Sequence, residues 1–165
     1  VLDNVAMARH SRTRSNVLEA FLGTPAQRRE EQAIRAAAES ALDLVGLKHR
    51  AADRPTDLPY GAQRLLEIAR ALATEPKLLL LDEPAAGMNP TEKRDLLALI
   101  QRINRDLGIT VVLIEHDMHL VMSACHQLTV LNFGAKIAAG TPADVRRNGA
   151  VIEAYLGRRH GHAGH

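Results

Sequence analysis

Residues 78–84 read LLLLDEP, and this stretch decides the fold. Four leucines in a row between turn signals are typical of a strand buried on both faces, as in a parallel sheet. Asp82 would then stand at the carboxyl end of that strand, the rim where open α/β folds bind ligands. A carboxylate there suits Mg²⁺ beside a phosphate, and Glu83 is placed to orient and deprotonate an attacking water. The alternative is a strand end that turns into solvent with two ordinary surface acids.

The residues after this stretch predict a strand–helix–strand unit. Asn89-Pro90-Thr91-Glu92 is typical of a helix start, with a cap, a proline at the first position and an acid at the third. Gly108 ends that helix, and residues 109–114 form a second β-branched apolar run. This order implies a parallel pair of strands joined by a right-handed crossover.

The rest of the chain predicts a helical part followed by a sheet-containing part. We expect a helical subdomain over residues 1–75, the C-terminal part of a catalytic core over 76–157, and a disordered Gly/His-rich tail over 158–165. The other expected elements are helices at 1–8, 25–47, 60–73, 117–124 and 151–156, a further helix starting at 141–144, and a hairpin of strands 127–131 and 135–139.

Composition excludes several classes of protein. Of 165 residues, 46% are hydrophobic and 24% are charged, which excludes a mainly disordered or collagen-like chain. A net charge of +2 is too small to indicate nucleic-acid binding. Cys125 is the single cysteine, so an internal disulfide and a cysteine-cluster zinc site are excluded. No apolar run reaches the roughly 18–20 residues of a membrane-spanning helix.

Two further motifs add candidate binding residues. Residues 58–64 read LPYGAQR, and Gly61 lies at the start of a predicted helix, where free N–H groups and the helix dipole favour an anion. His116 follows the second predicted strand, so it would lie near Asp82 and Glu83 and donate a hydrogen bond to a phosphate or to water. The alternatives are a plain loop-to-helix junction at Gly61 and a structural histidine at a helix start.

Together these motifs resemble the ATP-binding subunit of an ABC transporter. Residues 58–64 resemble its signature sequence and residues 78–84 its Walker B strand. Gly87 and Asn89 stand where that family has its D-loop, and His116 matches its switch histidine. Order and spacing agree up to Gly157. The fold expected from the resemblance is an α/β, P-loop NTPase-like parallel sheet with helices and an all-helical signature subdomain, incomplete at the N-terminus.

The resemblance narrows to importers of branched-chain amino acids. The LPYG of the signature is similar to the LAYG form of that subfamily, and DEPAAGMNP, LIEHDM and VIEAYLG are also similar to it. The insert around residues 21–25 is a further similarity. Pro59 and Tyr60 replace the usual serine and glycine of the signature, so the serine contact to phosphate is missing here.

The resemblance also implies roles for individual residues. Asp82 would hold Mg²⁺ through water, Glu83 would be the general base, and His116 would contact the γ-phosphate. Residues at the start of the signature helix would reach ATP bound to the opposite subunit, and D-loop residues would couple the two sites. These binding residues are Tyr60, Gly61, Gly87 and Asn89.

The implied cofactors are ATP and Mg²⁺, and the implied partners belong to a membrane complex. They are a second, homologous ATP-binding subunit in a head-to-tail dimer, transmembrane permease subunits that residues 25–47 would face, and indirectly a substrate-binding protein. Nucleic acid is not expected as a partner. The expected location is peripheral, at the cytoplasmic face of the inner membrane.

A phosphate loop is missing from the sequence. It requires G-x-x-x-x-G-K-[ST], and no lysine of this chain follows a glycine. We therefore expect the chain to be the C-terminal portion of a longer subunit and to be inactive alone. Two alternatives are an ABC ATPase that acts on DNA or the ribosome, and a non-catalytic interaction module without a phosphate loop.

Overall fold

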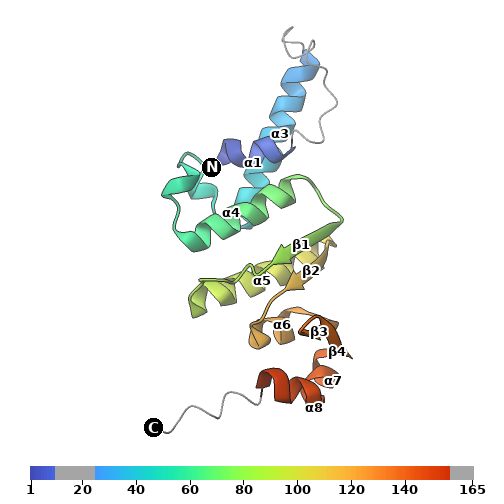
Figure 1. The fold of residues 1–165 in the computed structure, drawn as a ribbon. Coiled ribbons are helices and arrows are strands. Elements are labelled where there is room, and N and C mark those ends of the chain that lie inside the picture. The colour runs from blue at the N-terminus through green and yellow to red at the C-terminus, as the bar shows by residue number, and fades with distance from the viewer. Residues whose placement is uncertain (10–24, 157–165) are drawn as a thin grey trace. The chain divides into compact units, whose positions relative to one another are not determined.

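The computed structural model describes residues 1–9 and 25–156, which fall into two compact units. The first unit is Val1–Val112 and the second is Leu113–His165 (Figure 1). This division does not separate residues 1–75 from 76–157, so that predicted organisation stays a prediction. The expected tail at 158–165, and all but the last residue of the insert at 21–25, lie outside the described residues.

Three helices that pack against one another form the first part of the first unit. They are α1 (Leu2–Arg9), α3 (Pro25–Leu44) and α4 (Tyr60–Ala73), and each contacts the other two. Val5 of α1 and Leu42 of α3 are completely buried between them. Burial of an aliphatic side chain of this size contributes about 1.5–3 kcal/mol, so apolar packing accounts for this cluster. The helices expected at 1–8 and 60–73 are confirmed, and the helix expected at 25–47 is present but ends at Leu44.

The connection from α3 to α4 contains two short 3₁₀ turns, η2 (Lys48–Arg50) and η3 (Pro55–Asp57). The N-terminal ammonium group of Val1 donates a 2.7 Å hydrogen bond to the Asp53 carbonyl oxygen in this connection.

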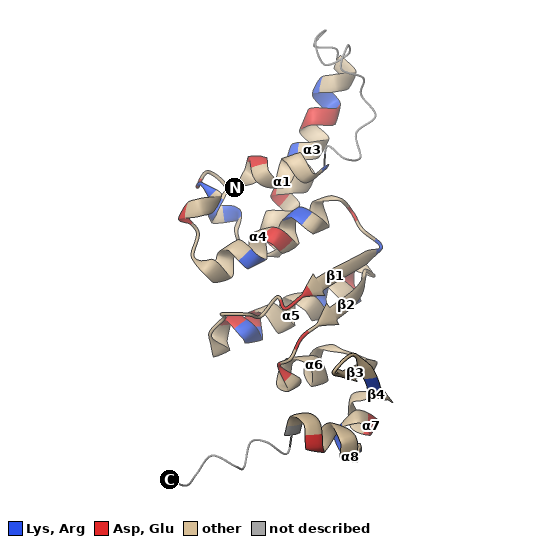
Figure 2. Cartoon of the chain, viewed as in Figure 1, with Lys and Arg blue, Asp and Glu red and all other residues tan. Residues whose placement is uncertain are grey.

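Lys, Arg, Asp and Glu are interspersed along α3 and α4 (Figure 2), which is typical of solvated helix faces.

A strand–helix–strand segment follows. Its elements are β1 (Leu78–Asp82), α5 (Pro90–Leu107) and β2 (Thr110–Ile114). β1 and β2 form a two-stranded parallel sheet, and the Thr110 N–H donates a 3.0 Å hydrogen bond to the Lys77 carbonyl oxygen at its start. The predicted strand–helix–strand unit is confirmed.

Both ends of α5 follow the sequence signals. The Asn89 side chain accepts hydrogen bonds from the N–H groups of Thr91 and Glu92, and the Glu92 side chain accepts one from the Asn89 N–H. Gly108 ends the helix in the left-handed conformation, with φ of 66°. Four apolar side chains on one face of α5 are buried: Leu96, Leu99, Ile100 and Ile103.

The prediction that β1 is buried on both faces is wrong. Leu79 and Leu81 are buried, but Leu78 is 51% and Leu80 is 68% exposed. Successive side chains of a strand point to opposite faces. Among the described residues of the first unit, only one face of β1 is therefore covered.

The first helix of the second unit is α6 (Met118–Ala124), which the Asp117 side chain caps. Strands β3 (Leu128–Asn132) and β4 (Ala135–Gly140) pair antiparallel. Phe133 and Gly134 between them have φ of 47° and 79°. Two successive positive φ angles are typical of the type I′ turn, whose twist matches that of the strands, so the expected hairpin is confirmed.

The second unit ends in short helical segments. They are α7 (Pro142–Arg147), α8 (Gly149–Val151) and a π-helical turn, η4 (Ile152–Leu156). The Tyr155 hydroxyl donates a 2.5 Å hydrogen bond to the Leu131 carbonyl oxygen, which fixes this turn against β3. Within the described part of the chain, no helix combines the length and the apolar character needed to cross a membrane.

Replacing Leu96 by alanine tests the packing of α5. Leu96 is completely buried, so we expect Leu96→Ala to lower the free energy of unfolding by about 2–5 kcal/mol. The matched control is Leu107→Ala, because Leu107 lies on the same helix and is 49% exposed. Urea denaturation of both variants gives the comparison. Equal losses of unfolding free energy in the two variants would contradict the burial of Leu96 in the core.

The cap of α7 makes a second prediction. Hydrogen bonds from the Thr141 hydroxyl and then the Thr141 N–H lower the pKa of Asp144. A carboxyl whose folded pKa is depressed stabilises the fold above its unfolded pKa of about 3.9, and loses this effect as the pH falls through the folded value.

We therefore expect Asp144→Asn to lower the melting temperature at pH 7 and to leave it unchanged near pH 2. Thr141→Ala removes the main cause of the shift, so the Asp144→Asn effect should shrink in that background. A deficit of equal size at both pH values would contradict this explanation.

Candidate functional site

The turn between β1 and α5 holds the predicted carboxylates. Asp82 is the last residue of β1, and Glu83 follows it with φ of 45°. A residue other than glycine in this left-handed region costs roughly 1–3 kcal/mol, and such residues cluster at functional sites. Both residues are exposed.

The exposed Asp82 carboxylate fits the way proteins bind Mg²⁺. That ion keeps several waters and is held by one or two carboxylates together with substrate phosphates. Among the residues that the structure describes, no group of three or more His, Cys, Asp or Glu is arranged to hold a metal. The role of Asp82 as a Mg²⁺ ligand stays a prediction.

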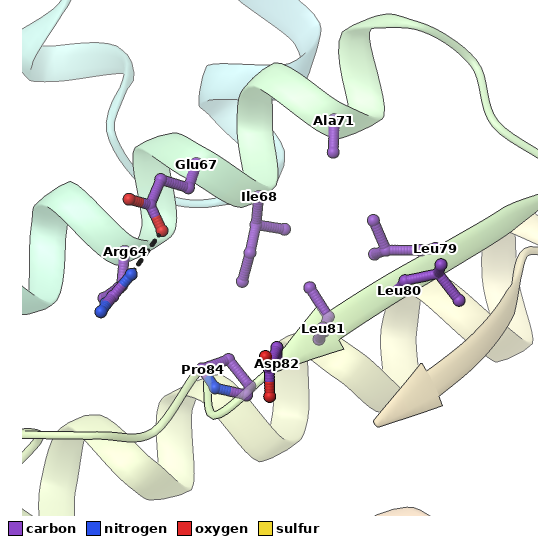
Figure 3. Close-up of a pocket in the computed structure, with 9 residues that line it drawn as sticks. All are labelled: Arg64, Glu67, Ile68, Ala71, Leu79, Leu80, Leu81, Asp82 and Pro84. Carbon is purple, nitrogen blue, oxygen red and sulfur yellow. Dashed lines mark hydrogen bonds and ion pairs between the residues drawn. The ribbon is translucent and has the colours of Figure 1, made fainter. Parts of the chain in front are cut away.

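A pocket lies between α4 and β1, beside the strand end (Figure 3). Its volume is about 140 Å³, which is below the roughly 300–1,000 Å³ of small-molecule sites. It is therefore too small to be a nucleotide site by itself. The residues that line it are Arg64, Glu67, Ile68, Ala71, Leu79, Leu80, Leu81, Asp82 and Pro84.

Arg64 links this pocket to the start of α4. It donates a 2.8 Å hydrogen bond to Glu67 and further bonds of 2.8 Å and 3.2 Å to the Tyr60 hydroxyl oxygen. Its guanidinium carbon lies 5.2 Å from the centre of the Tyr60 ring, within cation–π range. The bond to Glu67, and then that to Tyr60, raise the pKa of Arg64.

The first turn of α4 contains Gly61, whose role in binding an anion stays a prediction. Pro59 stands at the N-cap and makes no side-chain capping bond. Gly61 follows in the first turn and is buried. A Cβ added there would lie 2.8 Å from the Glu92 Oε1 atom. The backbone of Gly61 is therefore in close contact with the first turn of α5.

The turn before α5 contacts α4 at a second point. Gly87 has φ of 71°, and a Cβ added there would lie 2.9 Å from the Cε1 atom of the Tyr60 ring. Asn89 completes this turn as the N-cap of α5. The structure thus brings Tyr60 and Gly61 together with the turn that contains Gly87 and Asn89.

His116 lies in the second unit, so its predicted place near Asp82 and Glu83 stays a prediction. Its side chain is 72% exposed, whereas that of Glu115 is 1% exposed, and the His116 Nδ1 atom is 4.0 Å from the Glu115 Oε2 atom. The three residues of the EHD motif thus differ in role. The Glu115 side chain is covered although the residue as a whole is half-buried. His116 faces solvent and Asp117 caps α6.

Three residues at these positions were not assigned a role from the sequence. Glu92 was identified only as part of a helix start, and Arg64 and Glu115 were only quoted within motifs. The capping pattern predicts that Glu92 lies in the first turn of a helix. The contact of Glu92 with Gly61, however, joins residues far apart in the chain. No spacing rule predicts such a contact.

Known proteins resemble this chain over most of its length. The ABC transporter family model matches residues 2–86. The model described as "Branched-chain amino acid ATP-binding cassette transporter" matches residues 135–161. The chain is 46% identical over 156 residues to the high-affinity branched-chain amino acid transport ATP-binding protein BraF of Pseudomonas aeruginosa, covering 94% of this chain and 61% of that protein. It is 42% identical over 157 residues to LivG of Salmonella typhimurium, covering 95% and 62%.

Solved structures agree with this similarity and confirm the expected fold. An inward-facing putative metal-chelate type ABC transporter matches with a TM-score of 0.76 at 26% identity, covering 94% of this chain and 57% of that one. The ADP conformation of MJ1267, an ATP-binding cassette of an ABC transporter, matches with a TM-score of 0.73 at 28% identity, covering 94% and 62%.

The chain thus spans about three-fifths of the length of these two curated relatives. The family model alone matches more than half of the chain, and the motifs that it covers include the signature sequence and the Walker B strand. The chain therefore belongs to the ABC transporter family.

Proposed function

We propose that this chain is part of the ATP-binding and ATP-hydrolysing subunit of an ABC importer for branched-chain amino acids. The observation that carries the proposal is that the start of α4 meets the segment after the LLLLDEP strand at two points, Tyr60 at Gly87 and Gly61 at the Glu92 side chain. Relatives described as branched-chain amino acid transport ATP-binding proteins support the substrate class. The relatives give no support to a DNA- or ribosome-associated ATPase or to a non-catalytic module.

The residues of this chain would share the work of hydrolysis. The Asp82 carboxylate would hold Mg²⁺ through water, and Mg²⁺ would neutralise charge on the phosphates. Glu83 would take a proton from the attacking water, which its exposed position beside the strand end allows. His116 would donate a hydrogen bond to the γ-phosphate, and its exposed imidazole is consistent with that role.

The signature end of α4 would act on a nucleotide held by a second ATP-binding subunit. An uncapped helix start presents free N–H groups to an anion, and Gly61 would let the backbone approach closely. Tyr60, Gly87 and Asn89 would lie at the same interface. We place this dimer against transmembrane permeases at the cytoplasmic face of the membrane, served by a substrate-binding protein and without nucleic acid.

Replacing Glu83 tests the proposed general base. In the complete ATP-binding subunit, assembled with its partners, we expect Glu83→Gln to lower the rate of ATP hydrolysis by about 10²–10⁴-fold, because the base is lost while ATP binding remains. The matched control is Glu39→Gln, an exposed acid on α3 paired with Arg35. Phosphate release and ATP binding are measured on the same samples. Hydrolysis by Glu83→Gln at the unmodified rate would exclude this role.

A further prediction concerns MgATP binding by the 165-residue chain alone. It contains no G-x-x-x-x-G-K-[ST] loop to hold phosphates, so we expect no specific binding of MgATP at micromolar concentration. Isothermal titration calorimetry measures this, with the complete subunit as the positive control. A saturable micromolar isotherm for the 165-residue chain would show that its own residues suffice for binding.

A further inference from the structure

We propose that Glu92 is a positioning residue that ties the first turn of α4 to the turn before α5. The inference deepens the proposed function and rests on it, because both turns belong to the surface assigned above to the second subunit's nucleotide. Glu92 itself would not touch that nucleotide. It would act through Gly61 and Asn89.

The Glu92 carboxylate is held between the two turns. Its Oε2 atom accepts a 2.8 Å hydrogen bond from the Asn89 N–H. Its Oε1 atom lies 2.8 Å from the position of a Cβ added at Gly61. The Asn89 Oδ1 atom in turn accepts bonds of 2.9 Å and 3.0 Å from Thr91 and Glu92. Both oxygens of Glu92 therefore have defined neighbours, one on each turn.

A second contact runs in the opposite direction. The Tyr60 ring extends from α4 and lies against Gly87, where no side chain could be accommodated without a shift. Hydrogen bonds from Arg64 to the Tyr60 hydroxyl oxygen hold the ring in place. Glu92 reaches from α5 to α4 while Tyr60 reaches from α4 to the turn before α5. The two turns therefore meet at two points, with one side chain contributed from each side.

This tie has a consequence for catalysis. Two groups that meet one nucleotide contribute most when they are fixed relative to each other, because misplacement by about 1 Å can cost 10²-fold in rate. If Gly61 and the turn at Asn89 move as one body, both reach the nucleotide together when the subunits close. Removing Glu92 would break its hydrogen bond with the Asn89 N–H and end its contact with Gly61, so the two turns would lose their common position.

The first test uses the 165-residue chain and asks whether the effect of Gly61→Ala on the melting temperature changes sign when Glu92 is removed. Alanine in place of glycine inside a helix normally stabilises, by an amount equal to about 1–4 °C in melting temperature here. A Cβ at position 61 would instead push the Glu92 carboxylate off the Asn89 N–H. We therefore expect Gly61→Ala to lower the melting temperature of the unmodified chain and to raise it in the Glu92→Ala background.

The matched control is Gly149→Ala, since Gly149 begins α8 and a Cβ added there meets nothing within 4 Å. We expect Gly149→Ala to have the same effect on the melting temperature in the unmodified chain and in the Glu92→Ala background, either a rise or no change. If Gly61→Ala has the same effect with and without Glu92, the tie does not exist and the inference is overturned.

The second test uses the complete subunit assembled with its partners. We expect Glu92→Ala to lower kcat for ATP hydrolysis by on the order of tenfold while KM for ATP stays unchanged. Glu92→Gln keeps the length and an oxygen acceptor for the Asn89 N–H, so it should restore most of kcat. Partial unfolding alone would lower the rates of both variants in proportion to their stability.

A kcat for Glu92→Ala equal to that of the unmodified subunit would overturn the positioning role. Absence of hydrolysis by the unmodified subunit would overturn the proposed function, and with it the catalytic consequence of the tie. The reversal in melting temperature would still establish the tie itself, so the two failures are distinguishable.

Discussion

The turn from Glu83 to Asn89 is the constraint on which the site of the first unit depends. It begins with a left-handed glutamate and ends with the capping box of α5. Between these points the Ala86 N–H bonds to the Glu83 carbonyl oxygen at 3.1 Å and the Met88 N–H to the Ala85 carbonyl oxygen at 3.2 Å. These short-range bonds fix the positions of Gly87 and Asn89 relative to Asp82 and Glu83. The start of α4 then packs against a surface that is already defined.

The exposed face of β1 shows how this unit differs from an ordinary closed sheet. Leu78 and Leu80 face outward while their neighbours are buried. Apolar side chains of this size are normally covered, because each contributes about 1.5–3 kcal/mol when removed from water. The same strand places Asp82 at its end, so the uncovered face and the candidate metal ligand belong to one element.

Local signals predicted most of the fold. Asn89, Asp117 and Thr141 were each expected to begin a helix and each caps one, because a cap needs only its next three residues. The expected strand–helix–strand order also follows from local patterns. The sequence could not predict the one-sided burial of β1, because four leucines satisfy either environment. The contact of Glu92 with Gly61 depends on how α4 and α5 pack, and no local pattern encodes it.

We propose that this chain is part of the subunit that powers the import of branched-chain amino acids. Uptake of labelled leucine into proteoliposomes tests it most directly, with the complete subunit, its partner ATPase, the permeases and the binding protein present. We expect leucine uptake to require MgATP on the side of the ATP-binding subunits and to be reduced by competition from unlabelled isoleucine and valine. Hydrolysis of ATP without uptake of any of these amino acids would contradict it.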